Sequence, residues 1–133
     1  MSALRSLLEH LADRELGQEV VEDRLRMVEA SAIDDLYVLE DEHGIQGLLG
    51  FRVRENIEER SRYGEVSALV TRPQARRSGY GRALMAFAEQ LAKERGCKGT
   101  WLVSGFGREA DAHKFYSRLG YEVTGYRFVK AIE

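Results

Sequence analysis

The 133-residue sequence predicts a single α/β domain, residues 1–133, in which helices cover both faces of a mixed β-sheet. Three observations predict this class. Leucines recur with helical spacing near the start, two apolar runs are then separated by a turn, and a later strand is followed by a glycine-containing loop and a strong helix. Strands joined by a turn are antiparallel, whereas strands joined through a helix are parallel, so both orientations are expected in one three-layered fold.

The first half of the sequence predicts two helices followed by a strand hairpin. The first helix is marked by leucines at i, i+3, i+4 and i+7: Leu4, Leu7, Leu8 and Leu11. A second helical stripe follows Gly17, at Val21, Leu25 and Val28. The apolar runs 36–39 and 46–53 flank a turn at 41–44, which is typical of a hairpin.

A third strand and a strong helix follow a charged loop at residues 54–62. In residues 63–71 two sets of side chains alternate, and each set is expected on its own face: Val66, Ala68 and Val70 against Glu65, Ser67, Leu69 and Thr71. The helix after Gly81 has an apolar face made by Leu84, Phe87, Ala88 and Leu91. Gly96 is expected to end it.

The last part of the chain predicts a strand, a helix and closing strands. Residues 100–104 are strand-like, and the next helix is marked by an apolar stripe: Ala112, Phe115, Tyr116 and Leu119. Residues 121–123 and 126–132 carry the β-branched and aromatic side chains typical of strands. We therefore expect two closing strands there.

Composition argues against several classes of protein. The formal net charge is −2, whereas a general nucleic-acid binder usually carries a basic surplus. No apolar run is long enough to cross a bilayer, and the start lacks a signal-peptide pattern, so a cytoplasmic protein with no membrane partner is expected. Cys97 is the only cysteine, and with three scattered histidines it shows no metal-ligand spacing. No metal site is expected.

The segment from Arg76 to Gly81 is the most informative one for function. It lies between a predicted strand and a predicted helix, whose first amides lack intrahelical partners and carry partial positive charge. Such a helix start binds anions, and glycines let a phosphate approach the backbone closely. A P-loop is excluded because Gly81 is followed by Arg82 and Ala83, and a dinucleotide fingerprint is excluded because its third glycine is Leu84.

Two motifs resemble the GNAT family of N-acetyltransferases. Residues 76–81 match its motif A, Gln/Arg-x-x-Gly-x-Gly/Ala, and residues 112–121 resemble its closing Ala-x-x-Phe-Tyr segment. The end of the chain is also similar, more weakly, to aminoalkylphosphonate and aminoglycoside-type acetyltransferases. The resemblance implies a splayed, mostly antiparallel sheet within a three-layer α/β/α fold. The family usually opens with a strand, whereas this sequence begins with the helix pattern at Leu4, so that strand is expected to be short or missing.

The resemblance implies transfer of an acetyl group from acetyl-coenzyme A (acetyl-CoA) to a primary amine of a small molecule. The amine would attack directly, through a tetrahedral intermediate. The residues implied to contact coenzyme A are Leu69, Val70, Thr71, Arg76, Arg77, Ser78, Gly79, Tyr80, Gly81, Arg82, Ser104 and Ala112. Tyr116 occupies the position of the family's usual general acid. Many members are homodimers, and the sequence does not decide that state.

The remaining site residues are inferred from chemistry and position. A typical amine is protonated near neutral pH and must lose a proton before it attacks, so a base is needed, and Glu65 is the candidate. Arg52 and Arg54 flank the loop expected to border the acceptor pocket and are candidates for binding an anionic acceptor. Two other functions stay open: a protein or peptide N-acetyltransferase, and a coenzyme A-binding regulator without turnover.

Overall fold

The computed structural model describes residues 2–75, 78–104 and 109–132. The chain forms two compact units, residues 1–101 and 102–133. The helices are α1 (Ser2–Ala12), α2 (Gln18–Ala30), α3 (Tyr80–Glu94) and α4 (Lys114–Arg118), with single turns η1 (Pro73–Ala75) and η2 (Glu109–His113). The strands are β1 (Asp34–Asp41), β2 (Gly44–Glu55), β3 (Arg62–Thr71) and β4 (Gly99–Leu102).

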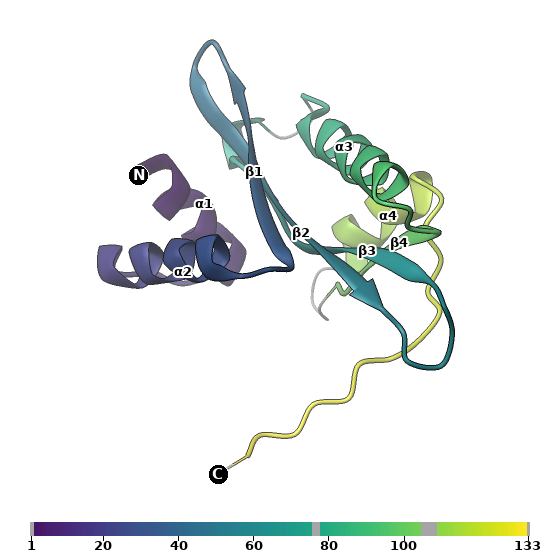
Figure 1. The fold of residues 1–133 in the computed structure, drawn as a ribbon. Helices are drawn as coiled ribbons and strands as arrows, with labels where there is room; N and C mark the ends of the chain where they lie inside the picture. Colours follow the sequence, from purple (N-terminus) through teal and green to yellow (C-terminus); the bar gives the residue numbers. More distant parts are fainter. Residues whose placement is uncertain (1, 76–77, 105–108, 133) are drawn as a thin grey trace. The chain divides into compact units, whose positions relative to one another are not determined.

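The first unit is built on an open sheet of strand order β1-β2-β3-β4 (Figure 1). β1, β2 and β3 are antiparallel neighbours, and Gly44, with φ of 109°, closes the β1–β2 turn. The Lys98 amide donates to the Arg62 carbonyl at 2.9 Å, so β4 begins beside the start of β3 and runs parallel to it, with α3 as the crossover. The expected mixed sheet is confirmed.

Helices cover both faces of this sheet. On one face Leu7 of α1 packs against Leu48 and Val70, with a ring of partly buried apolar side chains around them: Leu4, Leu8, Leu11, Leu36, Ile45 and Ala68. On the other face lies α3, and Figure 1 shows α1 and α2 opposite it across the sheet. The three-layer prediction is confirmed for this unit.

The apolar face of α3 differs from its prediction at Phe87. The buried side chains are Leu84, Met85, Ala88, Leu91 and Ala92. Phe87 is 42% exposed, and its ring packs edge to face on Tyr37, with centroids 4.9 Å apart. The helix ends at Glu94, and Gly96 follows with φ of 73°, as expected for a helix terminator.

The predicted alternation along β3 is wrong at its first half. Gly50 pairs with Ala68, whereas the next residue of β2, Phe51, pairs with Val66, so Ser67 is an extra residue in β3. Beyond such a bulge, each side chain lies on the opposite face of the sheet from the one that strict alternation predicts. Glu65 pairs with Arg52 and therefore shares a face with Ala68 and Val70, not with Leu69 and Thr71.

The second unit contains η2, α4 and an extended C-terminal segment. The predicted helix over residues 112–119 is confirmed in part, as a π-turn followed by α4. The predicted closing strands at 121–123 and 126–132 are wrong in this structure, since residues 121–132 have no regular structure. Tyr126 and Phe128 are 84% and 93% exposed. Side chains with high strand propensity do not satisfy the backbone N–H and C=O groups of a strand. A strand therefore forms only where a neighbouring strand pairs with those groups.

Candidate functional site

The predicted anion-binding loop lies between the end of β3 and the start of α3. Gly79 is the N-cap residue of α3 and has φ of 80°, the left-handed conformation that glycine adopts at low cost. A Cβ added at Gly79 would meet no atom within 4 Å, so the space above it is open. Arg76 and Arg77, two of the predicted coenzyme-binding residues, lie outside the described residues.

The first turn of α3 leaves amides available to an anion. The Ala83 amide donates to the Gly79 carbonyl at 3.0 Å, so the amides of Tyr80, Gly81 and Arg82 precede the first intrahelical bond. Gly79 provides no side-chain cap for them. The Ser78 amide, by contrast, already donates to the Ala75 carbonyl at 3.2 Å. This helix start therefore fits a pyrophosphate, with the amides after Gly79 as its donors.

The predicted arm-binding residues Leu69, Val70 and Thr71 form the end of β3. On one side they pair with Leu49, Leu48 and Gly47 of β2. On the other side β4 begins beside Arg62 and is four residues long, so a parallel β4 ends before it reaches Leu69. Val70 is buried and packs on Leu7 and Leu48, which leaves the backbone of this stretch as the group that an extended ligand would contact.

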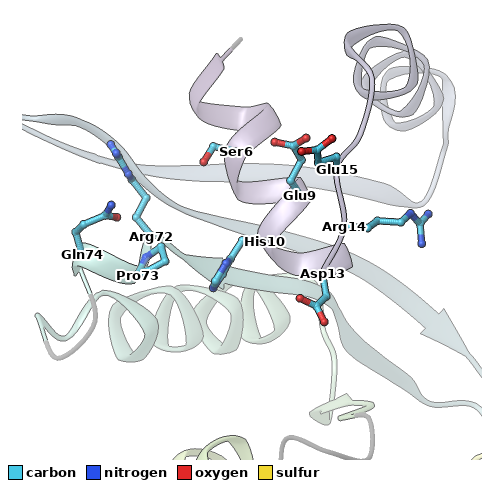
Figure 2. A pocket seen from close by; sticks show the side chains of 9 residues that line it. All are labelled: Ser6, Glu9, His10, Asp13, Arg14, Glu15, Arg72, Pro73 and Gln74. Carbon is cyan, nitrogen blue, oxygen red and sulfur yellow. The ribbon is translucent and has the colours of Figure 1, made fainter.

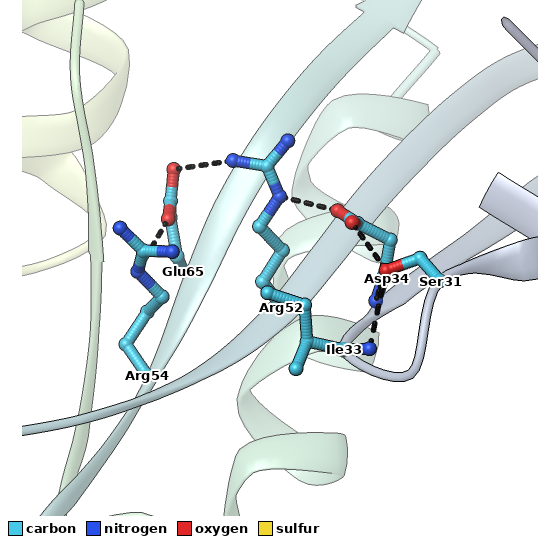
Figure 3. Close-up of polar contacts among 6 residues, drawn as sticks. All are labelled: Ser31, Ile33, Asp34, Arg52, Arg54 and Glu65. Atoms are coloured by element: carbon cyan, nitrogen blue, oxygen red, sulfur yellow. Dashed lines mark hydrogen bonds and ion pairs between the residues drawn. The ribbon is translucent and has the colours of Figure 1, made fainter. Parts of the chain in front are cut away.

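A network of charged side chains crosses β1, β2 and β3 (Figure 3), on the face that carries Leu48 and Ala68 and that α1 covers. Asp34, Arg52 and Glu65 are cross-strand neighbours in register. Arg52 Nε donates to Asp34 Oδ1, and Arg52 Nη1 lies 3.7 Å from Glu65 Oε2. Arg54 Nε lies 3.4 Å from Glu65 Oε1. The structure thus brings Glu65, Arg52 and Arg54 together.

The two arginines of this network differ in the number of carboxylates that they face. Burial would raise the pKa of Asp34, but hydrogen bonds from Arg52 and Ser31 and the charges of Arg52 and Arg54 outweigh it, so that pKa lies below its usual value. The hydrogen bond with Asp34 raises the pKa of Arg52. Arg52 therefore faces two carboxylates, whereas Arg54 faces one and its side chain is 48% exposed.

Glu65 is held in a partly dehydrated position. Its side chain is 14% exposed, and its buried Oε1 accepts no hydrogen bond from the described residues, although Arg54 Nε lies 3.4 Å away. A carboxylate oxygen that keeps a free lone pair is able to accept a proton.

A pocket of about 470 Å³ lies next to the segment that leads into the loop (Figure 2). Its walls come from the end of α1 with the turn after it, and from the segment after β3: Ser6, Glu9, His10, Asp13, Arg14, Glu15, Arg72, Pro73 and Gln74. Carboxylates and guanidinium groups both line it. Its volume is in the range of small-molecule sites.

Three predicted site residues belong to the second unit. Tyr116 lies on α4 and is half-buried, and its ring packs edge to face on Phe115 and on Tyr121, with centroids 5.1 and 6.1 Å away. Its carbonyl accepts the Tyr121 amide at 3.0 Å. Ala112 lies in η2, and Ser104 follows β4; both are half-buried.

Sequence reasoning missed two carboxylates in the first unit. Asp34 completes the Arg52 network, and Asp41 accepts a hydrogen bond from the Tyr80 hydroxyl at 2.5 Å. Asp41 had been assigned only to a turn. Its partner lies 39 residues away, so no local pattern could have connected them. Strand register would have suggested Asp34, had the pairing of β1 with β2 been known.

In the described part of the chain, no group of three or more His, Cys, Asp and Glu side chains is arranged to hold a metal ion. No described helix combines the length and apolarity needed to span a bilayer. Burial raises the pKa of the Cys97 thiol, which is the direction expected for an inert side chain.

Comparisons with known proteins agree with the motifs. The model of the acetyltransferase (GNAT) family matches residues 3–121. An aminoalkylphosphonate N-acetyltransferase from Salmonella typhimurium is 33% identical over 88 residues, which are 66% of this chain and 56% of that protein. The "Uncharacterized N-acetyltransferase YhdJ" from Bacillus subtilis is 32% identical over 98 residues, 73% of this chain and 68% of that protein.

The fold gives an independent comparison. The crystal structure of a GNAT family acetyltransferase from Staphylococcus aureus has a TM-score of 0.83 and 26% identity, with 98% of this chain and 88% of that chain covered. The family model matches well over half of the chain, and both motifs fall within that match. The chain therefore belongs to the acetyltransferase (GNAT) family.

Proposed function

We propose that this protein is an acetyl-CoA-dependent N-acetyltransferase that acts on a primary amine of a small molecule. The observation that carries the proposal is the start of α3, where left-handed Gly79 precedes three amides that lack intrahelical partners. Those amides would bind the pyrophosphate of coenzyme A. The backbone of Leu69 to Thr71 would contact its pantetheine arm. Acetyl-CoA supplies the acetyl group as a thioester, which makes the carbonyl carbon open to attack.

Starting from the ammonium form, the acceptor nitrogen loses one proton before it attacks and a second as the amide forms, while the sulfur gains one and the other goes to solvent. The amine lone pair forms a C–N bond to the carbonyl carbon, and the C–S bond breaks as the thiolate leaves. Glu65 would take the first proton from the amine, directly or through water, and pass it to solvent. Tyr116 would donate its hydroxyl proton to the thiolate. These roles rest on the family resemblance and on the chemistry of each side chain.

The acceptor is proposed to carry an anionic group as well as its amine. The Salmonella typhimurium relative acts on aminoalkylphosphonates, and this chain has a guanidinium pair beside Glu65. Arg52 is neutralised by Asp34 and Glu65. Arg54 is the more exposed of the two and engages one carboxylate, so Arg54 is the better candidate for an anionic acceptor.

One assay tests the function as a whole. Thiol release from acetyl-CoA is followed across aminoalkylphosphonates, polyamines, aminoglycosides, amino acids and short peptides. Release with a small amine supports the proposal, and release with peptides alone would assign a peptide N-acetyltransferase. Saturable coenzyme A binding without release for any amine would assign a non-catalytic regulator.

Replacing Gly79 with alanine is expected to weaken coenzyme A binding about tenfold, because a Cβ would occupy the open space where a phosphate approaches the amides, and a hydrogen bond to a charged group contributes about 1.5–3 kcal/mol. Gly96→Ala is the matched control. Gly96 also has positive φ, 73°, with open space around it, but lies at the opposite end of α3. Both variants should lose about 1–2 kcal/mol of stability. Isothermal titration with coenzyme A separates them, and equal affinities would contradict the proposed site.

Removing the Arg54 charge with Arg54→Gln is expected to raise the KM for an aminoalkylphosphonate about tenfold, because a charge-assisted contact with the acceptor is lost. The KM for an uncharged amine of the same chain length should stay within about twofold, since only the anionic acceptor loses a contact, whereas loss of the Arg54–Glu65 ion pair would change kcat for both amines alike. Arg62→Gln is the control, because Arg62 pairs with Glu55 on the exposed part of the same hairpin. A parallel rise for both amines would exclude Arg54 from acceptor recognition.

A further inference from the structure

The end of the β1–β2 hairpin contacts both ends of the predicted pyrophosphate loop. Before the loop, the Arg72 amide donates to the Gln46 carbonyl at 2.9 Å. After the loop, the Tyr80 hydroxyl donates to Asp41 Oδ2 at 2.5 Å. Tyr80 is the residue between Gly79 and Gly81 and the first residue of α3. The hairpin therefore holds the chain where it enters the loop and where it leaves.

These two anchors are connected to each other through the side chain of Asp41. Its Oδ1 accepts the His43 amide at 2.8 Å and the Gln46 side-chain amide at 3.2 Å, while Oδ2 accepts Tyr80. Gln46 is 7% exposed, so its side chain is held within the structure. Each oxygen of Asp41 has a partner, and the carboxylate has one orientation that satisfies all three donors.

The surroundings keep this arrangement rigid. A Cβ on Gly47, next to Gln46, would lie 2.9 Å from Leu84 Cδ1, so β2 and the second turn of α3 are in direct contact. The bond with Tyr80 is the main reason that the pKa of Asp41 is lowered, and the same bond raises the pKa of the Tyr80 hydroxyl. The lowered pKa of Asp41 keeps its carboxylate charged near neutral pH, and the raised pKa of Tyr80 keeps its hydroxyl protonated, as the hydrogen bond between them requires.

We propose that Asp41 and Tyr80 are positioning residues that hold the first amides of α3 in the orientation that binds the pyrophosphate of coenzyme A. The inference rests on the proposed function. Gly79 has no side chain to cap the helix, and helix ends fray unless they are tied down. The Asp41–Tyr80 bond ties this end from outside the helix. Without it, binding would have to order the first turn, and that entropy cost would appear as lost affinity.

The test compares Tyr80→Phe, Asp41→Ala and the double variant with the unchanged protein. Each single variant is expected to bind coenzyme A about tenfold more weakly, the loss typical of a charge-assisted hydrogen bond, and the double variant no more weakly than either single one. With any amine that the protein accepts, the KM for acetyl-CoA should rise while kcat at saturation stays the same. Isothermal titration and steady-state kinetics give these values.

Tyr37→Phe is the matched control. It also removes a tyrosine hydroxyl bonded to a charged partner, since Arg95 Nη2 donates to Tyr37 Oη at 3.1 Å, but at the far end of α3. It should leave coenzyme A affinity unchanged. Hydrogen exchange without ligand adds a second readout: the Ala83 amide, which makes the first intrahelical hydrogen bond of α3, should exchange about tenfold faster in Tyr80→Phe and at the unchanged rate in Tyr37→Phe.

Three outcomes are decisive. If the unchanged protein shows no saturable binding at millimolar coenzyme A, the proposed function fails, although faster exchange in Tyr80→Phe would still establish the tether. If the unchanged protein binds and Tyr80→Phe binds within twofold, the inference is overturned. If Tyr80→Phe does not fold, Asp41→Asn replaces it, because asparagine keeps one acceptor oxygen. An intermediate loss of affinity then supports the inference, and unchanged affinity overturns it.

Discussion

Replacing Tyr116 with phenylalanine is expected to lower kcat about a hundredfold, the lower end of what general acid catalysis contributes. The phenylalanine ring keeps the edge-to-face contacts with Phe115 and Tyr121, so α4 should keep its packing. The thiolate, however, would have to leave without a proton donor. The Kd for acetyl-CoA should change by less than about threefold, since the hydroxyl acts on the leaving group and not on the phosphates.

Stopped-flow or steady-state thiol release measures the first value, and titration calorimetry measures the second. Tyr121→Phe is the control, because Tyr121 lies in the same aromatic cluster and also carries a hydroxyl. It should turn over at the rate of the unchanged protein. Undiminished turnover in Tyr116→Phe would remove Tyr116 from the mechanism, and a loss of affinity equal to the loss of kcat/KM would assign it to binding.

Replacing Phe51 with alanine is expected to lower the free energy of unfolding by about 3–5 kcal/mol. Phe51 is fully buried on the α3 side of the sheet, and it packs over Gly64 and beside Ala92. Total stabilities of domains are about 5–15 kcal/mol, so this single cavity would leave a marginal protein. Urea denaturation followed by circular dichroism measures the change.

Gly64→Ala tests the same contact from the opposite side. A Cβ on Gly64 would lie 2.6 Å from Phe51 Cζ and 3.2 Å from Ala92 Cβ, so overpacking should cost about 1–3 kcal/mol. In the Phe51→Ala background that Cβ would enter the cavity, and its cost should fall or change sign. Gly125→Ala is the control, because nothing lies within 4 Å of that position. Additive costs for Phe51 and Gly64 would mean that the two residues are not in contact.

Local patterns were sufficient for most of the elements. The leucine spacing from Leu4 to Leu11 predicted α1, and the turn at 41–44 predicted the β1–β2 hairpin. The strand, glycine loop and helix around Gly79 predicted the parallel crossover and the helix start at which we propose that an anion binds. These signals are readable because helix and strand periodicity, helix termination and the freedom of glycine act over a few neighbouring residues.

The errors arose where pairing between distant segments decides the outcome. The extra residue Ser67 in β3 moved Glu65 to the other face, and nothing in an alternating sequence marks where the register shifts. The segment 126–132 has strand propensity, yet in this structure it has no regular conformation. Propensity does not provide the neighbouring strand on which a β-strand depends.

By itself the sequence determined that a strand is followed by Gly79 and then by a helix whose first amides lack intrahelical partners. These features depend only on the backbone of a few neighbouring residues. Only the tertiary structure decided which charges meet. It placed Glu65 between Arg52 and Arg54, and it joined Asp41 to Tyr80 across 39 residues. Electrostatic and hydrogen-bond contacts act through space over a few ångströms, so they follow strand register and helix packing and not distance along the chain.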